Sequence, residues 1–302
     1  MYSRISTAEY TRNCCAEPAE RLREALAGAE AVLVGAGSGL SAAAGLAYSG
    51  PRFECRFADF IAKYGFTDMY SAAFHRYASL EEHWAYWSRH IYLNRYDRPV
   101  GRPYKDLLAA VRERDYFVLT TNVDHLFADA GFEEERLFPT QGDYGLWQCS
   151  RPCHDTTYGN EAAVRQMLAA QRKMRVPAAL VPRCPRCGAP LTMNLRVDGA
   201  FVEDAAWHAA KARYLAFLRR TEGSRVVFLE LGVGGNTPGI IKYPFWRMAL
   251  ANSNSLYVCA NRGEAFAPKG LGDRALCVDG DIAPLLAAVS GRAAGEITRS
   301  CK

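Results

Sequence analysis

The chain has 302 residues, of which 49% are hydrophobic and 23% charged, a composition typical of a folded globular protein. Its net charge of +5 comes from 37 basic and 32 acidic residues that are spread without a basic block, so nucleic acid is not an expected partner. No stretch approaches the roughly 20 apolar residues of a membrane span, and residues 1–16 lack the pattern of an export signal. We therefore expect a cytoplasmic protein that binds neither nucleic acid nor a membrane.

The first predicted elements are a helix and the strand that follows it. Pro18 stands where a helix would begin, and Gly28 stands where it would end. Residues 31–34 read Ala-Val-Leu-Val and predict a buried strand. Three glycines at alternate positions then lead into an Ala-rich run of high helix propensity, which predicts a tight turn and a second helix.

The glycine-rich turn, Gly35-Ala36-Gly37-Ser38-Gly39, suits a phosphate. Glycines let the backbone approach an anion closely, and the N–H groups and dipole of the new helix favour negative charge. Ser38 would either cap this helix or donate its hydroxyl to a phosphate oxygen. Because the spacing is Gly-x-Gly-x-Gly rather than Gly-x-Gly-x-x-Gly, a plain strand-to-helix turn is the alternative to a nucleotide site.

The region after this turn predicts a loop and then a helical, aromatic segment. Residues 46–56 carry the Ser-Gly-Pro punctuation of a loop, which we expect to overlie the ligand. Within 57–96, Trp84, Trp87 and Ile91 fall on one helical face, which predicts packing against the rest of the domain. In the alternative interpretation, polar residues of this segment line a substrate cleft: Arg89, His90, Asn94 and Arg95.

A helix over 104–114 and a buried strand over 116–119 form the next predicted unit. This strand ends at Thr120-Thr121-Asn122-Val123-Asp124. Ligands of doubly wound folds bind at the carboxyl ends of the strands, so Asn122 and Asp124 are candidate site residues. Both residue types also favour capped turns, which is the structural alternative.

Residues 138–145 predict another short strand end, and two close cysteine pairs follow. The pairs are separated by 30 residues, and the second is a Cys-Pro-x-Cys-Gly knuckle, a pattern typical of a closed tetrahedral Zn²⁺ site with a structural role. The predicted ligands are Cys149, Cys153, Cys184 and Cys187. His154 is a spare ligand that we expect to be a bystander. The remaining cysteines lack this spacing and are expected to be structural or surface thiols: Cys14, Cys15, Cys55, Cys259, Cys277 and Cys301.

The last third of the chain continues the alternation of helices and strands. A helix over 204–220 and a strand over 225–231 lead into a second glycine-rich loop at 232–239. Two such loops on one sheet would hold the two sides of a dinucleotide. Strands over 256–261 and 275–281 precede the last helix, 282–289. This order predicts a parallel sheet with helices on both faces.

Together these segments resemble the sirtuins. Gly35-Ala36-Gly37-Ser38 matches the Gly-Ala-Gly turn of that family, and 120–124 matches its Thr-Gln-Asn-Ile-Asp segment. A four-cysteine zinc module is also inserted in the sirtuin nucleotide domain. The resemblance extends from about Ala31 to Val289, and it implies NAD as the cofactor beside a structural Zn²⁺.

The resemblance implies a set of NAD-binding residues. They are Gly35, Ala36, Gly37, Ser38, Leu40, Ser41, Thr121, Asn122, Asp124, Gln141, Gly232, Val233, Gly234, Asn236, Thr237, Asn261, Asp281 and Ile282.

The fold implied is α/β, a Rossmann-like doubly wound parallel sheet with an inserted small zinc-binding module and a helical insertion. The NAD-binding domain would comprise 1–48, 104–148 and 222–302. The aromatic helical insertion would be 49–103, and the zinc module with its connecting helix would be 149–221.

One departure from the sirtuin pattern bears on the reaction. Sirtuin deacylases carry a His before a Gly where this chain has Gln141-Gly142, and their Asp-Phe-Arg segment is absent from 46–53. A His can take a proton from a ribose hydroxyl, whereas a Gln side chain can only hydrogen-bond. Lysine deacylation by the usual route is therefore not expected.

Four segments resemble the macrodomain-linked branch, the class M sirtuins: 48–50, 84–90, 141–145 and 231–234. That resemblance implies a protein ADP-ribosyltransferase acting on a lipoylated carrier similar to the glycine-cleavage H protein. It also implies a macrodomain ADP-ribosyl hydrolase as functional partner and a link to oxidative stress in microbes.

Three residues are expected to be catalytic. Asn122 would hold the nicotinamide ribose or an attacking water, Asp124 would orient the neighbouring loop or act electrostatically, and Gln141 would fix the ribose hydroxyls or the acceptor. The competing hypotheses are a lysine deacylase with another base, a non-catalytic NAD or ADP-ribose sensor, and an NAD glycohydrolase.

Overall fold

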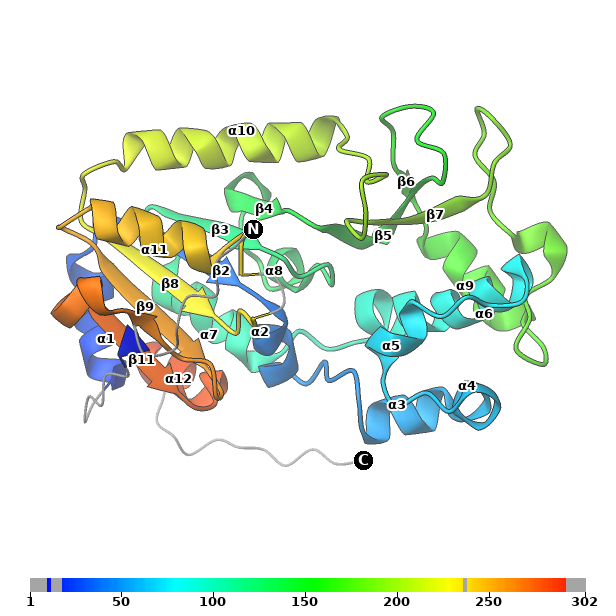
Figure 1. Cartoon of the computed structure of the whole chain (residues 1–302), viewed down its shortest axis with the longest axis horizontal. Helices are drawn as coiled ribbons and strands as arrows, with labels where there is room; N and C mark the ends of the chain where they lie inside the picture. Colours follow the sequence, from blue (N-terminus) through cyan, green and yellow to red (C-terminus); the bar gives the residue numbers. More distant parts are fainter. Residues whose placement is uncertain (1–9, 12–17, 236–237, 292–302) are drawn as a thin grey trace.

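The computed structural model describes residues 10–11, 18–235 and 238–291. Figure 1 shows a larger lobe built on a parallel sheet and a smaller lobe of short helices and a small antiparallel sheet. The predicted NAD-binding residues Asn236 and Thr237 lie outside the described residues, as do Cys14, Cys15 and Cys301.

The larger lobe contains a six-stranded sheet in the order β11-β9-β8-β2-β3-β4, and every neighbouring pair in it is parallel. Its strands are β2 (Ala31–Ala36), β3 (Tyr116–Thr120), β4 (Leu137–Pro139), β8 (Val226–Leu231), β9 (Leu256–Asn261) and β11 (Ala275–Asp279). The chain winds outward from β2 to β3 and β4, and later from β8 to β9 and β11. The strand order therefore reverses between β2 and β8, which is where doubly wound folds bind ligands.

Helices cover both faces of this sheet because its central strands are apolar on both sides. Val32 and Val34 of β2 pack in one hydrophobic cluster and Leu33 packs in the opposite one. The first cluster is completed by α1 (Pro18–Gly28), α7 (Arg102–Val111) and α12 (Ile282–Val289), and the second by α10 (Ala205–Arg220) and α11 (Lys242–Ala251). The predicted doubly wound fold is confirmed.

The smaller lobe combines the helical insertion with the zinc module around one hydrophobic cluster. Trp84 of the insertion meets Trp147 of the antiparallel sheet with ring centroids 4.9 Å apart. The predicted packing of Trp84, Trp87 and Ile91 is confirmed by their burial. Its helices are α3 (Pro51–Arg56), α4 (Ala58–Tyr64), α5 (Met69–Ala73), α6 (Leu80–Ile91), η2 (Tyr92–Tyr96) and α9 (Glu161–Ala170), and its antiparallel strands are β5 (Gly142–Cys149), β6 (Tyr158–Gly159) and β7 (Leu191–Leu195).

The short elements complete the fold. Helix α2 (Ser38–Ala43) follows β2 after Gly37, and α8 (Leu126–Asp129) follows β3 after the segment 121–125. The remaining elements are the antiparallel pair β1 (Tyr10–Thr11) and β10 (Ala267–Pro268) and the short helices η3 (Glu134–Arg136), η4 (Ala178–Leu180) and η5 (Lys269–Arg274).

Two sequence expectations meet a different local structure. Residues 51–56, predicted as part of a loop, form α3, because Pro51 occupies the first turn of a helix where its missing N–H costs nothing. The boundary expected between the NAD-binding domain and the zinc module, between residues 148 and 149, falls inside β5. The helix expected to belong to the zinc module, α10, packs instead on the six-stranded sheet, where the ring centroids of Phe217 and Phe117 are 5.5 Å apart.

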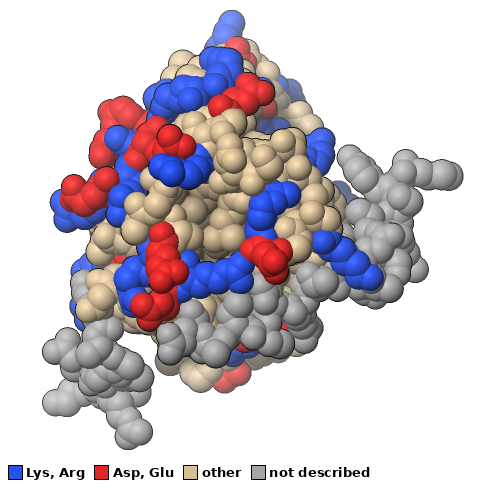
Figure 2. All heavy atoms as spheres, turned by 90° about the vertical axis from the view of Figure 1, so that its left-hand side faces the viewer, with Lys and Arg blue, Asp and Glu red and all other residues tan. Residues whose placement is uncertain are grey.

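The surface of the larger lobe carries both signs of charge. Figure 2 shows Lys and Arg side chains interleaved with Asp and Glu on this face rather than gathered in one basic field. Among the described residues, no helix combines the length and apolar character that crossing a membrane requires.

Candidate active site at the sheet edge

The two glycine-rich loops meet at the point where the strand order reverses. Gly37 N donates to Leu231 O at 3.0 Å, and Gly39 N donates to Gly232 O at 2.9 Å. A Cβ on Gly37 would lie 2.6 Å from Gly232 O, and Gly232 itself has a φ of 63°. The glycines of the first turn are thus required for backbone contact with the second loop. The residue that caps α2 is Gly37, so the predicted cap by Ser38 is wrong, and the exposed Ser38 is the first helical residue.

A hydrogen-bonded chain of four side chains lies beside this junction. Asn122 Nδ2 donates to Gly37 O at 3.0 Å and to Tyr104 Oη at 3.2 Å. Tyr104 Oη and Ser41 Oγ are 2.9 Å apart, and Ser41 Oγ donates to Asp124 Oδ2 at 2.5 Å. Because the Ser41 proton is used on the carboxylate, Tyr104 must be the donor to Ser41. The hydrogen bonds between these four side chains are therefore all donated in one direction, from the Asn122 amide toward the Asp124 carboxylate.

Burial holds these four hydrogen-bonded side chains in place. Tyr104 is 0% exposed, and Asp124 and Asn122 are 6% and 9% exposed. Burial raises the pKa of the Asp124 carboxyl, against the hydrogen bonds from Ser41 Oγ and Leu126 N that favour its charged form. Burial also raises the pKa of Tyr104 well above its ordinary value, so its hydroxyl keeps the proton that it donates. These bonds hold the Asn122 amide in one orientation.

Gln141 lies at the carboxyl end of the neighbouring strand. Thr140 N and Oγ1 both donate to Thr120 O, at 3.0 and 3.1 Å, which joins the ends of β3 and β4. Arg196 N donates to Gln141 O at 3.0 Å. The half-buried Gln141 side chain makes no hydrogen bond within the described part of the chain, so its amide is available to a ligand.

Three further predicted NAD-binding residues, Asn261, Asp281 and Ile282, lie at the same edge on the far side of the junction. Asn261 Nδ2 donates to Val233 O at 3.1 Å, which ties the end of β9 to the second glycine loop. Asp281 caps α12 by accepting from Ala283 N at 3.1 Å, and Ile282 is buried behind it. Polar groups thus follow the sheet edge from β4 to β11, as a dinucleotide across the junction would require.

Sequence reasoning missed several polar residues of this region. Tyr104 was expected only as part of a helix. His125 and Asp143 are hydrogen-bonded next to Asp124, with Nδ1 and Oδ2 2.6 Å apart. The sequence signals these two residues only by their position: His125 follows Asp124, and Asp143 is two residues beyond Gln141. Their contact with each other joins positions 18 residues apart, which no local pattern encodes.

A second set of hydrogen-bonded side chains, three tyrosines and one histidine, lies on the small-lobe side. Tyr48 Oη and Tyr144 Oη are 2.8 Å apart, and Tyr144 Oη lies 3.0 Å from His90 Nε2. His90 Nδ1 in turn lies 3.3 Å from Tyr86 Oη. Burial lowers the pKa of His90 to about 3, so the imidazole is neutral and both its nitrogens are engaged. His90 and the buried Asn94 therefore support the lobe rather than line an open cleft.

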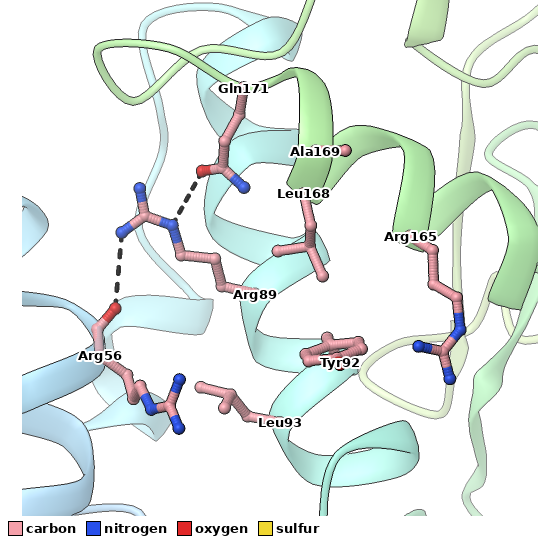
Figure 3. A pocket seen from close by; sticks show the side chains of 8 residues that line it. All are labelled: Arg56, Arg89, Tyr92, Leu93, Arg165, Leu168, Ala169 and Gln171. Carbon is pink, nitrogen blue, oxygen red and sulfur yellow. Dashed lines mark hydrogen bonds between the residues drawn. The ribbon is translucent and has the colours of Figure 1, made fainter.

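Arg89 instead borders a groove of about 590 Å³ between α3, α6 and α9 (Figure 3). Its guanidinium is held by both carboxylate oxygens of Asp59 and by Gln171 Oε1. The groove is also bordered by Arg56, Tyr92, Leu93, Arg165, Leu168 and Ala169. None of the predicted catalytic residues borders it, so it is separate from the sheet edge.

The four predicted zinc ligands converge at one end of the small sheet, with all their sulfur atoms within 4.8 Å of one another. Sγ of Cys149 lies 3.5 Å from Sγ of Cys187, and Sγ of Cys153 lies 3.7 Å from Sγ of Cys184. A tetrahedron of sulfurs at the usual Zn–S distance has edges of about 3.8 Å, so the quartet fits Zn²⁺. His154 is not part of the quartet, although its Nδ1 lies 3.0 Å from Cys153 Sγ; its Nε2 lies 2.6 Å from Tyr158 Oη.

Comparison with known proteins gives close relatives. No protein-family model matches the chain. A "Protein ADP-ribosyltransferase" of Staphylococcus aureus is 42% identical over 269 residues, which is 89% of this chain and 85% of that protein. A "Probable bifunctional ADP-ribose hydrolase/ADP-ribosyltransferase" of Fusarium oxysporum is 34% identical over 86% of this chain, which spans 45% of that longer protein.

Solved structures show the same fold at low identity. A Sir2 homologue in complex with NAD superposes with a TM-score of 0.62 at 14% identity, covering 95% of this chain and 97% of that one. Sir2Tm bound to a propionylated peptide gives a TM-score of 0.58 at 17% identity, covering 90% of this chain and 97% of that one. At these identities the likeness is one of fold.

Proposed function

The chain belongs to the ADP-ribosyltransferases of the sirtuin family, and on that premise we propose that it transfers ADP-ribose from NAD to a lipoylated carrier protein and releases nicotinamide. The observation that carries the reaction class is the 42% identity to a protein ADP-ribosyltransferase over 89% of the chain. The carrier is a finer proposal, which is supported by the resemblance of four segments to the class M sirtuins.

The sheet edge provides what this reaction needs from the protein. NAD supplies an ADP-ribosyl group whose bond to nicotinamide breaks with positive charge developing on the ribose. The junction of the two glycine loops and the helix ends beside it would bind the anionic pyrophosphate. The ribose that bears nicotinamide would then lie toward the ends of β3 and β4, which Asn122 and Gln141 follow by two residues.

Each candidate catalytic residue is given a role by its contacts. Asn122, fixed by Gly37 O and Tyr104 Oη, would hold the ribose or the attacking group in one geometry. Asp124 accepts a hydrogen bond from Ser41 and so fixes the side chains that hold Asn122. It would also add negative charge near the ribose carbon, where positive charge develops. Gln141 presents an amide that hydrogen-bonds without changing protonation, which suits binding of the ribose hydroxyls or the acceptor.

We also propose a macrodomain ADP-ribosyl hydrolase as functional partner. The Fusarium relative carries both activities in its name, and this chain aligns with 45% of its length. A hydrolase encoded beside or fused to the transferase would make the modification reversible. A cytoplasmic location and a role in oxidative stress belong to the same proposal.

The experiment is transfer of labelled ADP-ribose from NAD to a purified H-like carrier protein. Label on the lipoylated carrier, with at least tenfold less on the unlipoylated one, is the expected result. Loss of that label with Asn122→Ala would tie transfer to the sheet edge. Equal label on both carriers would contradict the lipoyl requirement, and release of an acetyl group from acetyl-lysine peptide without label would favour the deacylase.

A further inference from the structure

We propose that His125 and Asp143 form a general-base pair that takes the proton of the acceptor during ADP-ribosyl transfer, which requires an acceptor group with a dissociable proton. This inference rests on the proposed function. It adds a catalytic group and limits the acceptor to a group that carries a dissociable O–H, S–H or N–H proton.

The pair has the geometry of an oriented imidazole base. Nδ1 of His125 donates to Asp143 Oδ2 at 2.6 Å, so the neutral ring carries its proton on Nδ1 and has the lone pair of Nε2 available. Within the described residues, Nε2 has no hydrogen-bond partner, and the His125 side chain is 33% exposed. His125 therefore offers a proton acceptor to solvent or to a ligand.

Asp143 is held as a carboxylate. Its Oδ1 accepts from Arg95 Nε at 2.9 Å and from Gly145 N at 2.6 Å. Burial favours the neutral acid, but the hydrogen bond from His125 and the charge of Arg95 outweigh it and hold the pKa of Asp143 below its ordinary value. A fixed carboxylate behind an imidazole stabilises the imidazolium that forms when the ring takes a proton.

The backbone of His125 is also unusual. Its φ of 66° places it in the left-handed region, which L residues with a Cβ rarely adopt. Only Lys173 and Met174 share this property among the described non-glycine residues. The conformation sits at the start of α8, between Asp124 and the helix, while the side chain reaches Asp143. Strain of this kind is frequently retained at functional sites.

The pair lies between the two segments that carry the predicted catalytic residues. His125 directly follows Asp124, and Asp143 is two residues beyond Gln141. Tyr144 N donates to Val123 O at 2.8 Å, which joins these segments. Two charged groups lie on the Asp143 side of the imidazole, Asp143 itself in β5 and Arg95 in η2. On the other side are Asp124, the residue before His125, and Arg98, which donates to Asp124 O and to Asp129.

The three predicted catalytic residues are not suited to this task. The Asn122 and Gln141 amides do not exchange a proton at neutral pH. Both oxygens of Asp124 are committed, to Ser41 Oγ and to Leu126 N. Both nitrogens of the nearby His90 are used by tyrosine hydroxyls. His125 is the remaining base.

The step balances as a group transfer. The bond between nicotinamide and the ribose carbon breaks, and nicotinamide leaves as a neutral molecule with the bonding electron pair. The acceptor heteroatom forms the new bond to that carbon, and its proton passes to His125 Nε2 and then to solvent. A carboxylate acceptor has no proton to give, so the pair would then be without a role.

The test uses His125→Asn, because Asn tolerates the left-handed backbone but cannot take up a proton. We expect transfer to fall by about 100-fold or more and the acid limb of the pH profile of kcat/KM to disappear, while the Kd for NAD stays within twofold. Asp143→Asn should lower kcat with the KM for NAD unchanged. Imidazole in the buffer should restore part of the activity of His125→Ala.

The matched control is His208→Asn, since His208 is a surface histidine whose Nε2 also faces a carboxylate, Glu203 Oε2, at 4.0 Å. It should leave rate and pH profile unchanged. Wild-type rate and profile in a folded His125→Asn, or an acceptor mapped to a carboxylate by mass spectrometry, would overturn the inference. If the wild-type chain releases nicotinamide without labelling a carrier, the proposed function fails and water is the acceptor. In that case, slower nicotinamide release by His125→Asn would still support His125 as the base, and an unchanged rate would contradict it.

Discussion

The side-chain nitrogen of Asn122 lies 3.0 Å from the carbonyl oxygen of Gly37, which joins the end of β3 to the glycine turn after β2. The same nitrogen also donates to Tyr104, so the position of a candidate catalytic amide depends on a fully buried phenol in α7. A ligand that contacts the turn would therefore be coupled directly to the amide.

Tyr104→Phe should slow transfer while leaving the fold intact. It removes two buried hydrogen bonds, the one donated to Ser41 and the one accepted from Asn122, at a stability cost of about 1 kcal/mol for each. We expect kcat to fall about tenfold, a loss of about 1.4 kcal/mol in the transition state, with NAD affinity nearly unchanged. Steady-state kinetics and calorimetric titration measure both. Tyr116→Phe, which removes a buried hydroxyl bonded to Glu133 N away from the site, should leave kcat unaltered.

Loss of one zinc ligand should unfold the small lobe. Cys149 and Cys184 belong to the hydrophobic cluster that joins the zinc module to the helical insertion, so the metal and this core support each other. Cys184→Ser should abolish bound zinc, measured by elemental analysis, and lower the Tm, as should a chelator on the unmodified chain. Cys55→Ser, at an exposed cysteine outside the quartet, should retain one zinc per chain. Retention of zinc by Cys184→Ser would contradict the assignment.

A buried ion pair in the large lobe predicts a strong stability effect. Lys242 Nζ lies 2.5 Å from Glu230 Oε1, with side chains 2% and 0% exposed, and Tyr257 Oη donates to Glu230 Oε2. Lys242→Met leaves a buried charge unpaired and should lower the free energy of unfolding by about 3 to 5 kcal/mol. Urea denaturation measures the change.

The surface substitution Lys211→Met, on the exposed side of α10, should stay within about 0.5 kcal/mol of the unmodified chain in the same assay. A similarly small effect of Lys242→Met would show that Glu230 takes up a proton without cost when its partner is removed.

The sequence predicts the fold well because the fold follows from short-range patterns. The apolar run 31–34, the strand at 116–119 and residues 226–231 of the strand expected over 225–231 are buried on both faces, and the last helix has the expected bounds. The helix over 51–56 was missed because Ser49-Gly50-Pro51 reads equally as a loop and as the start of a helix.

The candidate site could be predicted only in part. Strand-end position points to Asn122 and Asp124, the sirtuin resemblance points to Gln141, and cysteine spacing predicts the zinc ligands, since all these signals are local. Tyr104 and Asp143 reach their partners across the fold, and no periodicity encodes those contacts. Likewise the glycines at 37 and 39 suggested a phosphate, whereas their close approach to Gly232 is visible only in three dimensions.

Asp143 should make stability depend on acid pH. Its pKa is below the ordinary value of about 3.9, because the His125 hydrogen bond and Arg95 outweigh burial, so the folded state binds the proton less readily than the unfolded chain. The stabilisation is complete above about pH 4 and is lost as the pH falls through the folded-state pKa. Asp143→Asn should cost about 2 kcal/mol at pH 7 and progressively less below pH 4.

Urea denaturation at pH 7, 5 and 3 measures this difference, with Glu222→Gln, an exposed carboxylate, as the control that should show almost none. A gap between the unmodified chain and Asp143→Asn that widens toward low pH would have the wrong sign and would contradict the ionised state of Asp143.

The most direct test of ADP-ribosyl transfer is the ratio of carrier-bound ADP-ribose to nicotinamide released, measured together for the unmodified chain and for Gln141→Ala. Transfer predicts a ratio near one for the unmodified chain, because each bond broken in NAD forms a bond to the acceptor. It also predicts that Gln141→Ala lowers both quantities or diverts the reaction to water. A ratio near zero for the unmodified chain with a folded lipoylated carrier would contradict transfer and identify the activity as hydrolysis of NAD.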